Sequence, residues 1–308
     1  MRFAITGSSG LIGSALVASL RKSGHDVVRL VRRSAARGDE IAWDPAAERG
    51  GLAPAAVDSL DVVINLAGAG VASRRWTSSY QAELRASRIR GTNGLVAALT
   101  AAGNPPSVLL SGSAIGFYGD TGGREVDESA PPGTGFLPGL ARDWEAAAQP
   151  AADAGIRVIT LRTGLVLSPR GGMLARLLPP FRLGLGARLG PGTQVMSWIS
   201  LREYTRIVEF LLTRDDVTGP VNMTAPGPVS NAEFTAALAA AVHRPAKLSV
   251  PGPVLRTALG GVSGDLLASA RVVPRALLTA GYEFRYPELP AALAAELRPA
   301  SPAPAEQH

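Results

Sequence analysis

The sequence of 308 residues contains no cysteine and only two lysines, Lys22 and Lys247. Without cysteine, disulfide bonds, thiolate metal ligands and a cysteine nucleophile are all excluded. With so little lysine, arginine supplies nearly all of the positive charge, since lysine and arginine together number 31. A mechanism that requires a lysine amine is therefore restricted to two positions in the chain.

Apolar runs long enough to span a membrane are also absent, and the N-terminal residues do not show the layout of a signal peptide. The net charge of +6 comes from scattered arginines, not from a basic run interleaved with aromatic residues. The three histidines, His25, His243 and His308, are too dispersed for a metal site or a catalytic triad. We therefore expect a cytoplasmic protein with no metal, no nucleic-acid partner and no membrane association. The sequence leaves open whether it forms a homo-oligomer.

Apolar runs and helical patterns alternate from the first residue, and hydrophobic residues make up 46% of the chain. The pattern predicts strands at 2–6, 26–31, 40–43, 61–66, 107–111 and 156–161, and helices at 11–23, 77–102 and 140–154. Such alternation is typical of the α/β class, with a parallel sheet and helices on both faces. The strand runs are apolar throughout, as expected when both faces of a sheet are buried. We therefore predict a Rossmann-type parallel sheet.

The alternation loosens after residue 164, where proline, glycine and arginine interrupt the chain. We expect residues 1–165 to form a Rossmann domain, with 201–225 returning to it as a helix and a strand. Residues 166–200 and 226–298 are predicted to form a smaller C-terminal substrate lobe over the carboxyl ends of the strands. The tail at 299–308 is rich in proline, alanine and serine and is predicted to be disordered.

A glycine-rich turn joins the first predicted strand to the first predicted helix. It follows Thr6 and reads Gly7-Ser8-Ser9-Gly10-Leu11-Ile12-Gly13. Glycines in this context permit a tight turn, a close approach of the backbone to a pyrophosphate and close helix–strand packing. The start of the helix adds free N–H groups and the positive end of its dipole. The turn predicts a dinucleotide site; the alternative is a purely structural turn in a protein that has lost its cofactor.

The end of the second predicted strand indicates which dinucleotide is bound. Proteins specific for NAD place an acidic residue there to bind the ribose 2′-hydroxyl, but this chain has Arg32 and Arg33. A guanidinium pairs well with a 2′-phosphate, so NADP(H) is favoured over NAD(H). The alternative is that both arginines are solvated at a strand end. The small residues of Leu66-Ala67-Gly68, after the fourth strand, are predicted to let the backbone pass close to the cofactor ribose.

Several motifs together resemble those of extended short-chain dehydrogenases and nucleotide-sugar epimerases. They are the glycine turn, the Asn65–Gly68 step, and Ser111-Gly112-Ser113-Ala114 leading to Tyr118-Gly119. Further segments resemble the atypical "epimerase family" group of NAD-dependent epimerase/dehydratase-like proteins. These segments are Trp43-Asp44-Pro45, Arg75-Trp76-Thr77, Ser87-Arg88-Ile89-x-Gly91-Thr92, Phe136-Leu137, Asp143-Trp144-Glu145, Ser197-Trp198-Ile199 and the stretch 271–287, which resembles the small C-terminal domain of that group. The resemblance spans about residues 1–295 and implies the Rossmann fold, NADP(H) binding and a cofactor contact at Ser111.

The resemblance also shows what the chain lacks. Members of the superfamily use a serine, a tyrosine and a lysine, with the last two four residues apart on one helix. Here the corresponding positions hold Phe136 and Leu140, neither of which can exchange a proton. Neither lysine of the chain lies near this stretch, so the usual tyrosinate mechanism is disfavoured.

The remaining catalytic candidates follow the fifth predicted strand. Ser113 stands at the position of the superfamily serine and could hydrogen-bond a substrate oxygen, or satisfy only local backbone. Tyr118 could donate a proton as a hydride arrives, or pack the loop as an aromatic side chain. Arg88 could supply the missing positive charge; we favour instead a salt-bridged helix arginine. Arg162 could reach an anionic substrate.

Two acidic residues, at 127 and 128, lie in the loop before the helix predicted at 140–154, and two more, at 143 and 145, lie on that helix. All four could serve as acid or base, but two acids on a surface helix are usually solvated. Together these features predict an NADP(H)-dependent oxidoreductase or a nucleotide-sugar-epimerase-like enzyme acting on a small polar substrate. In that hypothesis Ser113 orients the reacting oxygen and Tyr118 donates the proton. The alternative, suggested by the missing tyrosine–lysine pair, is a non-catalytic NADP(H)-binding sensor or scaffold.

Overall fold

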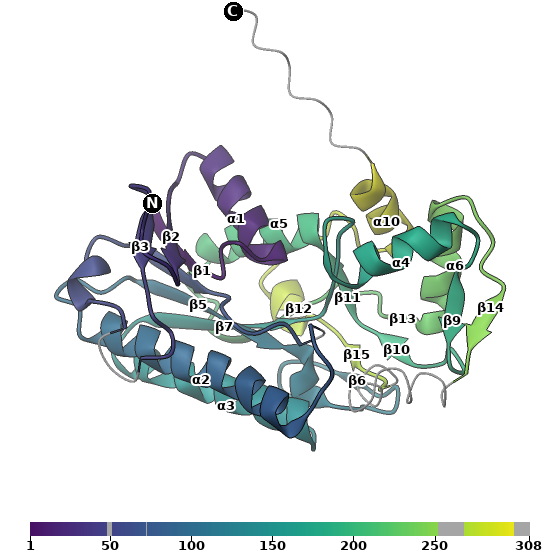
Figure 1. Cartoon of the computed structure of the whole chain (residues 1–308), viewed down its shortest axis with the longest axis horizontal. Coiled ribbons are helices and arrows are strands. Elements are labelled where there is room, and N and C mark those ends of the chain that lie inside the picture. Colours follow the sequence, from purple (N-terminus) through teal and green to yellow (C-terminus); the bar gives the residue numbers. More distant parts are fainter. Residues whose placement is uncertain (48–50, 72, 252–267, 299–308) are drawn as a thin grey trace, which may run out of the picture.

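The apolar runs of the chain form neighbouring strands of one parallel sheet (Figure 1). The computed structural model describes residues 1–47, 51–71, 73–251 and 268–298, so the tail predicted to be disordered lies outside the described residues. In spatial order the seven strands of the sheet are β12 (Gly219–Met223), β7 (Arg157–Thr163), β5 (Val108–Ala114), β4 (Val62–Asn65), β1 (Arg2–Thr6), β2 (Asp26–Val31) and β3 (Glu40–Ala42).

The strand order places a change of direction at the centre of the sheet. From β1 the chain moves outward through β2 to β3, and then returns to the other side of β1 to add β4, β5, β7 and β12. All six pairings are parallel. This is the Rossmann order, in which ligands bind outside the carboxyl ends of the strands where the direction reverses. The predicted fold class is confirmed.

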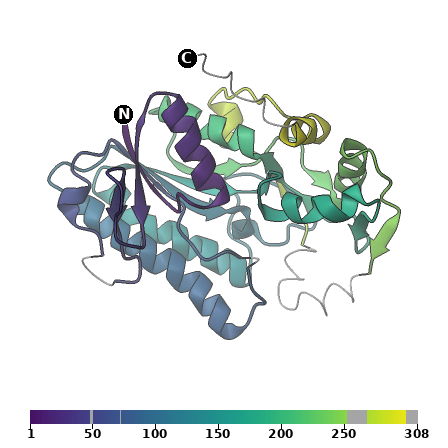
Figure 2. The same cartoon turned by 45° about the horizontal axis from the view of Figure 1, so that its top comes forward.

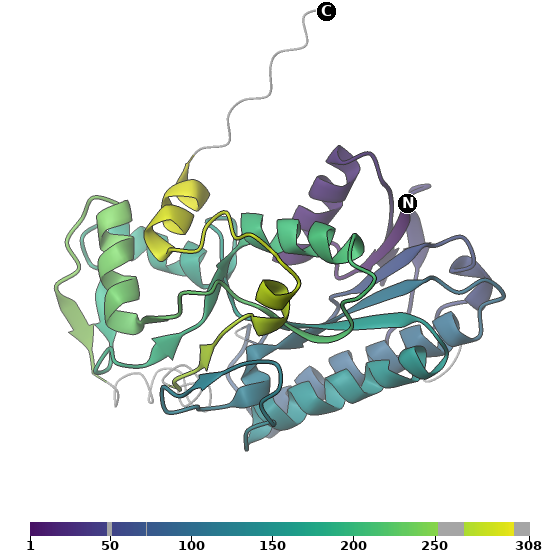
Figure 3. The ribbon, with the colours of Figure 1, turned by 180° about the vertical axis from the view of Figure 1, so that it is seen from behind.

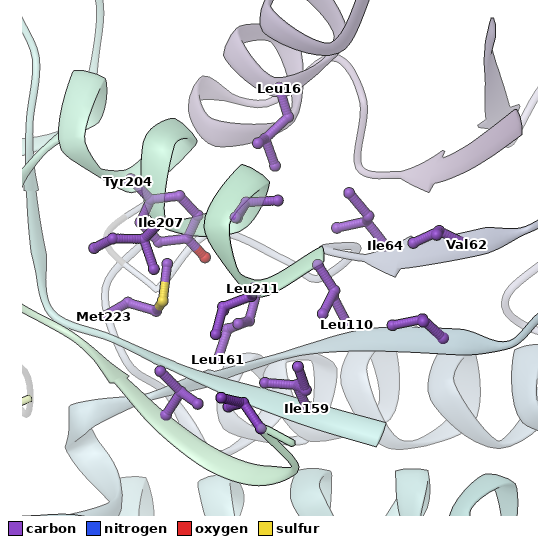
Figure 4. Packing of buried hydrophobic residues seen from close by; sticks show 14 of the residues in the cluster. Leu16, Val62, Ile64, Leu110, Ile159, Leu161, Tyr204, Ile207, Leu211 and Met223 are labelled. Carbon is purple, nitrogen blue, oxygen red and sulfur yellow. The ribbon is translucent and has the colours of Figure 1, made fainter. Parts of the chain in front are cut away.

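Helices cover both faces of the sheet, as Figures 1 and 3 show. One face carries α1 (Leu11–Lys22) and α5 (Leu201–Leu212), and the other carries α2 (Ser78–Thr100) and α3 (Phe136–Asp153). Side chains of successive strand residues point to opposite faces. Ile64 and Leu110 therefore pack with Leu16 and Tyr204 of the first pair of helices (Figure 4). Since both faces are covered, the strands are apolar on both sides.

The ends of two elements differ from those that the sequence predicts. Helix α3 begins at Phe136, four residues before the predicted start at Leu140. The loop before it ends at Gly135, whose φ of +110° suits glycine, and Pro138 lies in the first turn, where a missing N–H costs little. Strand β5 continues to Ala114, three residues past the predicted end, because its pairing with β7 continues to that residue.

The second half of the chain returns to the sheet and then leaves it. Helix α5 covers a face of the sheet and β12 forms its edge. The remaining elements are η1 (Pro54–Ala56), η2 (Ile115–Tyr118), β6 (Glu125–Val126), β8 (Leu165–Leu167), α4 (Gly172–Arg182), β9 (Ala187–Leu189), β10 (Val195–Met196), β11 (Trp198–Ser200), β13 (Val229–Ser230), α6 (Asn231–Ala241), β14 (Leu248–Val250), β15 (Arg271–Val272), α9 (Arg275–Thr279) and α10 (Leu289–Leu297).

Helices α4, α6 and α10 lie together beside the sheet, as Figures 1 and 2 show. They share a core of their own around Phe181, Trp198 and Phe234. Helix α4 falls where the sequence pattern loosens; its apolar residues Leu174, Leu178 and Phe181 are buried although Pro179 and Pro180 lie inside the helix. The boundaries of the two predicted domains stay a prediction.

A buried chain of hydrogen bonds connects the sheet to the helices below it. The Thr6 hydroxyl accepts from the first two N–H groups after β4, at 2.9 and 3.1 Å, and donates to Asn65 Oδ1 at 2.7 Å. Asn65 Nδ2 donates to Thr92 Oγ1 of α2 at 2.9 Å, and Trp144 Nε1 of α3 donates to the same oxygen at 3.1 Å. Strands β1 and β4 are thereby held in register with both helices at the carboxyl edge.

Replacing Thr6 with valine tests this chain of bonds while keeping the side-chain shape. Thr6→Val leaves two partly buried N–H groups and one buried amide oxygen without their partner, and we expect a loss of about 1–3 kcal/mol in the free energy of unfolding. Urea denaturation measures it. The matched control is Thr100→Val, which removes an exposed hydroxyl bonded only within α2 and should change stability by less than about 0.5 kcal/mol. Equal losses would contradict the role given to Thr6.

Candidate functional site

The β1–α1 turn can be made only by glycine at two of its positions. Gly7 has a φ of +64°, and a Cβ there would lie 2.7 Å from the carbonyl oxygen of Leu66. A Cβ on Gly13 would lie 2.3 Å from the carbonyl oxygen of Gly7. Both glycines are therefore required by close approaches of backbone to backbone. Gly10 has more room, because the nearest atom to its Cβ position is Gly7 O at 3.2 Å.

The start of α1 is open to an anionic ligand. Gly10 is its N-cap and offers no side chain to accept hydrogen bonds from the first turn, which contains no acidic residue. Ser9 and Gly10 are exposed, and Leu11 and Ile12 are partly exposed, whereas Ser8 is buried. The free N–H groups at such a helix start bind phosphate oxygens well. The residues present therefore fit the pyrophosphate of a dinucleotide.

The predicted cofactor contacts at the strand ends beside the turn form two groups, one exposed and one buried. Leu66 and Ala67 are partly exposed at the exit of β4, and Gly68 is exposed. Thr6 and Ser111 are fully buried, so neither side chain presents a surface to a ligand. Thr6 acts on the site through the hydrogen bonds that shape the β4 exit. The Ser111 hydroxyl has no hydrogen-bond partner in the part of the chain that the structure describes.

The two arginines after β2 differ in their surroundings. Arg33 donates from both terminal nitrogens to the buried carboxylate of Glu40, at 2.8 and 2.7 Å. The Arg33 hydrogen bonds, helped by the backbone N–H of Ala36, lower the pKa of Glu40 to about 2, so the pair stays ionised. Arg32 is exposed and makes no hydrogen bond or ion pair with the described residues. Arg32 is therefore the arginine whose guanidinium is open to a ligand.

The carboxyl edge of the sheet carries three polar residues side by side. Ser113 of β5 is level with Arg162 of β7, which is level with Asn222 of β12. The Ser113 hydroxyl donates to Glu145 Oε1 of α3 at 2.6 Å. Arg162 donates to both oxygens of the same carboxylate, at 2.8 and 2.9 Å. This bidentate ion pair is nearly buried, with 5% of the Arg162 and 15% of the Glu145 side chain exposed.

These contacts change two expectations. Glu145 was expected to be solvated on a surface helix, but it is held by Arg162 and touches the Ser113 hydroxyl. Arg162 was expected to reach an anionic substrate, but its charge is already paired inside the protein and its guanidinium lies over the Phe117 ring, 3.6 Å from the centroid. The sequence contained no local sign of this pairing, because the two residues lie on different elements.

Tyr118 is poorly suited to the proton-donor role predicted for it. Its hydroxyl donates to Asn222 Oδ1 at 2.7 Å and accepts from Arg162 Nη1 at 2.9 Å, and its side chain is buried. Burial raises the pKa of Tyr118 to about 12, and the opposing effect of the Arg162 charge does not cancel that rise. Since a proton donor works best with a pKa near the operating pH, the structure favours the alternative in which this tyrosine holds the loop.

The sequence analysis missed Asn222 and undervalued Glu128. Glu128 accepts from the backbone N–H groups of Asn222 and Ala276, at 2.9 and 3.2 Å, and its own carbonyl oxygen accepts from Arg162. Burial raises the pKa of Glu128. The only available sequence signal for Asn222 is an asparagine inside an apolar strand, which it shares with Asn65. Both asparagines join the end of a strand to its neighbours.

The two positions that the superfamily motif assigns to a tyrosine and a lysine lie in an apolar cluster. Phe136 and Leu140 lie on α3 and pack with Tyr80 and Leu84 of α2. Leu140 is buried in this cluster. This face of α3 therefore contributes packing instead of a cation.

Arg88 overturns the expectation of a salt-bridged helix arginine. Only 9% of its surface is exposed, and it has no acidic partner among the described residues. Its one hydrogen bond runs from Nη1 to the carbonyl oxygen of Leu84 at 3.2 Å, and its guanidinium lies 5.0 Å from the centroid of the Trp144 ring. Burial lowers the pKa of Arg88. It is a buried cation whose charge is not neutralised by an acid in the described part of the chain.

Metal ligands and membrane-spanning helices bear on the class of protein. No group of three or more histidine, aspartate or glutamate residues in this part of the chain could hold a metal ion. No helix in it combines the length and the apolar character needed to cross a membrane. The strand order, the glycine turn and the open helix start define a Rossmann-type α/β protein.

Comparison with known proteins identifies the family. The model of the NAD-dependent epimerase/dehydratase family matches residues 3–223, and that of a domain of unknown function, DUF1731, matches residues 250–296. The chain therefore belongs to the NAD-dependent epimerase/dehydratase family, as the motifs predict. It is 49% identical to the epimerase family protein MT2273 of Mycobacterium tuberculosis, over 92% of this chain and 93% of that protein.

Two solved structures are similar over nearly the whole chain. The crystal structure of the human epimerase family protein SDR39U1 (isoform 2) with NADPH matches with a TM-score of 0.88 and 34% identity, covering 96% of this chain and 98% of that one. The nucleoside-diphosphate sugar epimerase of Corynebacterium glutamicum matches with a TM-score of 0.80 and 36% identity, covering 96% of this chain and 58% of that one.

The state of Tyr118 can be measured without knowing a substrate. Because its pKa is raised, the hydroxyl keeps its proton up to about pH 12, above the ordinary tyrosine value of about 10. In the folded protein, Tyr118→Phe should therefore leave the tyrosinate absorbance below about pH 11 unchanged. An ultraviolet pH titration of both proteins tests this. Loss of an ionisation step near neutral pH in the variant would show that Tyr118 is an activated tyrosine after all.

Proposed function

We propose that this protein binds NADP(H) at the β1–α1 turn and acts as an oxidoreductase or epimerase-like enzyme on a small polar substrate. The observation that carries the proposal is the turn itself. Gly7 and Gly13 have no space for a side chain, and the helix that follows begins without a cap. The human relative SDR39U1, whose structure contains NADPH, supports the same assignment.

The preference for NADP(H) is assigned to Arg32. Arg33 already satisfies the buried Glu40 carboxylate, which would be left without its main partner if Arg33 turned to a ligand. Arg32 has no such commitment, and its guanidinium can form charge-assisted bonds with a 2′-phosphate. In this proposal Arg33 shapes the strand end and Arg32 binds the 2′-phosphate.

The proton chemistry is assigned to Ser113 and Glu145. A bound NADP(H) supplies hydride exchange with a substrate carbon. Ser113 Oγ binds the reacting oxygen and takes up a substrate hydroxyl proton while its own proton passes to Glu145 Oε1, to which it is already bonded at 2.6 Å. Arg162 keeps that carboxylate oriented. In the reverse direction protonated Glu145 returns the proton by the same route. Glu145 thus replaces Tyr118 in the hypothesis drawn from the sequence.

The second candidate is a non-catalytic NADP(H)-binding sensor or scaffold. It is favoured by one observation, the apolar packing of Phe136 and Leu140 at the two positions where the superfamily motif has a tyrosine and a lysine. In that reading the Glu145–Arg162 ion pair only holds α3 to β7. Turnover separates the two functions, since both require the dinucleotide.

Calorimetric titration with NADPH and NADH tests cofactor binding. We expect the protein to prefer NADPH, and Arg32→Glu to weaken NADPH by about a hundredfold while changing NADH by less than about threefold, since a charged contact is lost and a repulsion gained. The matched control is Arg37→Glu, an exposed arginine of the same loop. Binding of neither dinucleotide by the unchanged protein would refute the proposed function. An equal loss of both in Arg32→Glu would refute only the assignment of Arg32.

A panel of aldehydes and ketones tests turnover. We expect NADPH oxidation with at least one member, and Glu145→Gln to lower kcat about a hundredfold or more with NADPH affinity unchanged, because an amide cannot accept the proton. Absorbance of NADPH follows the reaction. Tight NADPH binding with no oxidation across the panel would favour the sensor instead.

A further inference from the structure

Two partly exposed aromatic residues, Trp76 and Phe136, form an aromatic corner. Trp76 lies in the loop between β4 and α2, and Phe136 is the first residue of α3. Their ring centroids are 5.4 Å apart, with an angle of 71° between the ring planes. The other three tryptophans of the chain, Trp43, Trp144 and Trp198, are buried. The corner is therefore a place where aromatic surface is open to a ligand.

The loop that carries Trp76 is held by hydrogen bonds. Trp76 Nε1 donates to the carbonyl oxygen of Val71 at 2.8 Å, and the Tyr80 hydroxyl donates to that of Gly70. The side chain of Thr77 accepts from the backbone N–H of Tyr80 and caps α2. The one donor of the indole is therefore satisfied inside the protein, so a ligand meets only its apolar ring.

Helix α3 runs beside β5 and beyond its end. A Cβ built on Gly112, near the end of the strand, would lie 2.8 Å from Cζ2 of Trp144. A Cβ built on Gly116, after the strand, would lie 3.3 Å from Cβ of Leu137. As β5 proceeds toward the carboxyl edge of the sheet, its contacts thus move toward the start of α3. The first turn of this helix therefore stands past that edge, where ligands of this fold bind.

The corner lies within the length of a small substrate from Ser113. Phe136 is eight residues before Trp144 on α3, which is about 12 Å along the helix. Ser113 is one residue beyond Gly112, which is about 3 Å along the strand. The step from Ser113 to the corner is therefore roughly 9 Å in this direction. Leu137, partly exposed beside Phe136, adds apolar surface.

The chemistry of the corner favours a flat apolar group. Aromatic rings bind other rings edge-to-face or offset, and the apolar area removed from water adds to the binding free energy. A carboxylate or a phosphate would be desolvated against the rings without gaining a partner. Arg74, an exposed cation of the same loop, already donates to Glu83 at 3.3 Å and lies 5.7 Å from the centroid of the Tyr80 ring.

We propose that the aromatic corner binds a flat apolar group of the substrate while Ser113 binds the reacting oxygen. The substrate class is then an aldehyde or ketone, or the corresponding alcohol, with an aryl or alkenyl group attached. Its reduction adds a hydride from NADPH to the carbonyl carbon and a proton, passed from Glu145 through Ser113, to the oxygen, which yields the alcohol and NADP⁺. The inference rests on the proposed function and narrows its small polar substrate to one that is polar only at the reacting end.

Titration calorimetry of the NADPH complex with two alcohols tests the substrate class. An alcohol is not oxidised by NADPH, so binding is measured without turnover. The probes are 2-naphthylmethanol, which presents a flat apolar group, and glycerol, which is polar throughout. We expect 2-naphthylmethanol to bind at least about tenfold more tightly than glycerol, because its rings are buried against the corner. Equal affinities, or tighter binding of glycerol, would contradict the proposal.

Variants of both rings locate the apolar group. Trp76→Leu and Phe136→Leu should each weaken 2-naphthylmethanol about tenfold and change NADPH affinity by less than about twofold, whereas Trp76→Phe should keep most of the affinity. Ser113→Ala should weaken the same alcohol about three- to tenfold, through loss of the hydroxyl contact. The matched control is Phe284→Leu, which removes a partly exposed phenylalanine on the α5 side of the sheet and should leave both affinities unchanged.

The remaining outcomes are decisive. Unchanged 2-naphthylmethanol affinity in both ring variants, or an equal loss of NADPH and alcohol affinity, would overturn the assignment of the corner. No binding of 2-naphthylmethanol by the unchanged protein, with NADPH bound, would refute this inference and leave the proposed function standing. No NADPH binding by the unchanged protein would refute the proposed function, and this inference with it.

Discussion

The contact between the β1–α1 turn and the exit of β4 constrains the whole carboxyl edge of the sheet. Gly7 passes so close to the Leu66 carbonyl that no side chain fits, and the Thr6 hydroxyl binds the two N–H groups that follow β4. The turn and the strand exit are therefore shaped together. Through Asn65 and Thr92 the same restraint reaches α2, so the height at which Arg88 meets the exit is set by the turn as well.

A second restraint fixes the other side of the site. The Arg162–Glu145 ion pair satisfies both partners inside the protein, and such a pair is costly to break because either charge would be left buried alone. Arg162 also donates a hydrogen bond to the Tyr118 hydroxyl, and this hydroxyl donates one to Asn222 Oδ1. Both hydrogen bonds of the Tyr118 hydroxyl are therefore made inside the protein. Ser113 is left in contact with the Glu145 carboxylate, which Arg162 holds in place. This contact is the reason that the proposed proton route uses Glu145.

Three arginines around the site, at positions 33, 88 and 162, differ in whether an acidic side chain neutralises them. Arg33 is paired with Glu40 and Arg162 with Glu145, so both are structural charges. Arg88 is buried and has no acidic partner among the residues that the structure describes. Because the chain has only two lysines, arginines carry the positive charge around the site. The planar donors of a guanidinium suit phosphate oxygens.

The sequence by itself determined the fold class, the order of the first strands and helices, and the glycine turn, because these depend on local spacing: apolar runs set the strands, and three glycines at fixed intervals set the turn. It also showed that Phe136 and Leu140 cannot exchange protons. The tertiary structure alone decided which charges are free. Glu145 lies 17 residues from Arg162, and Tyr118 lies 104 residues from Asn222, and such partners meet only when distant elements pack. A charge is neutralised by the side chains that pack against it in the folded protein. The residues next to it in the sequence do not show which side chains these are.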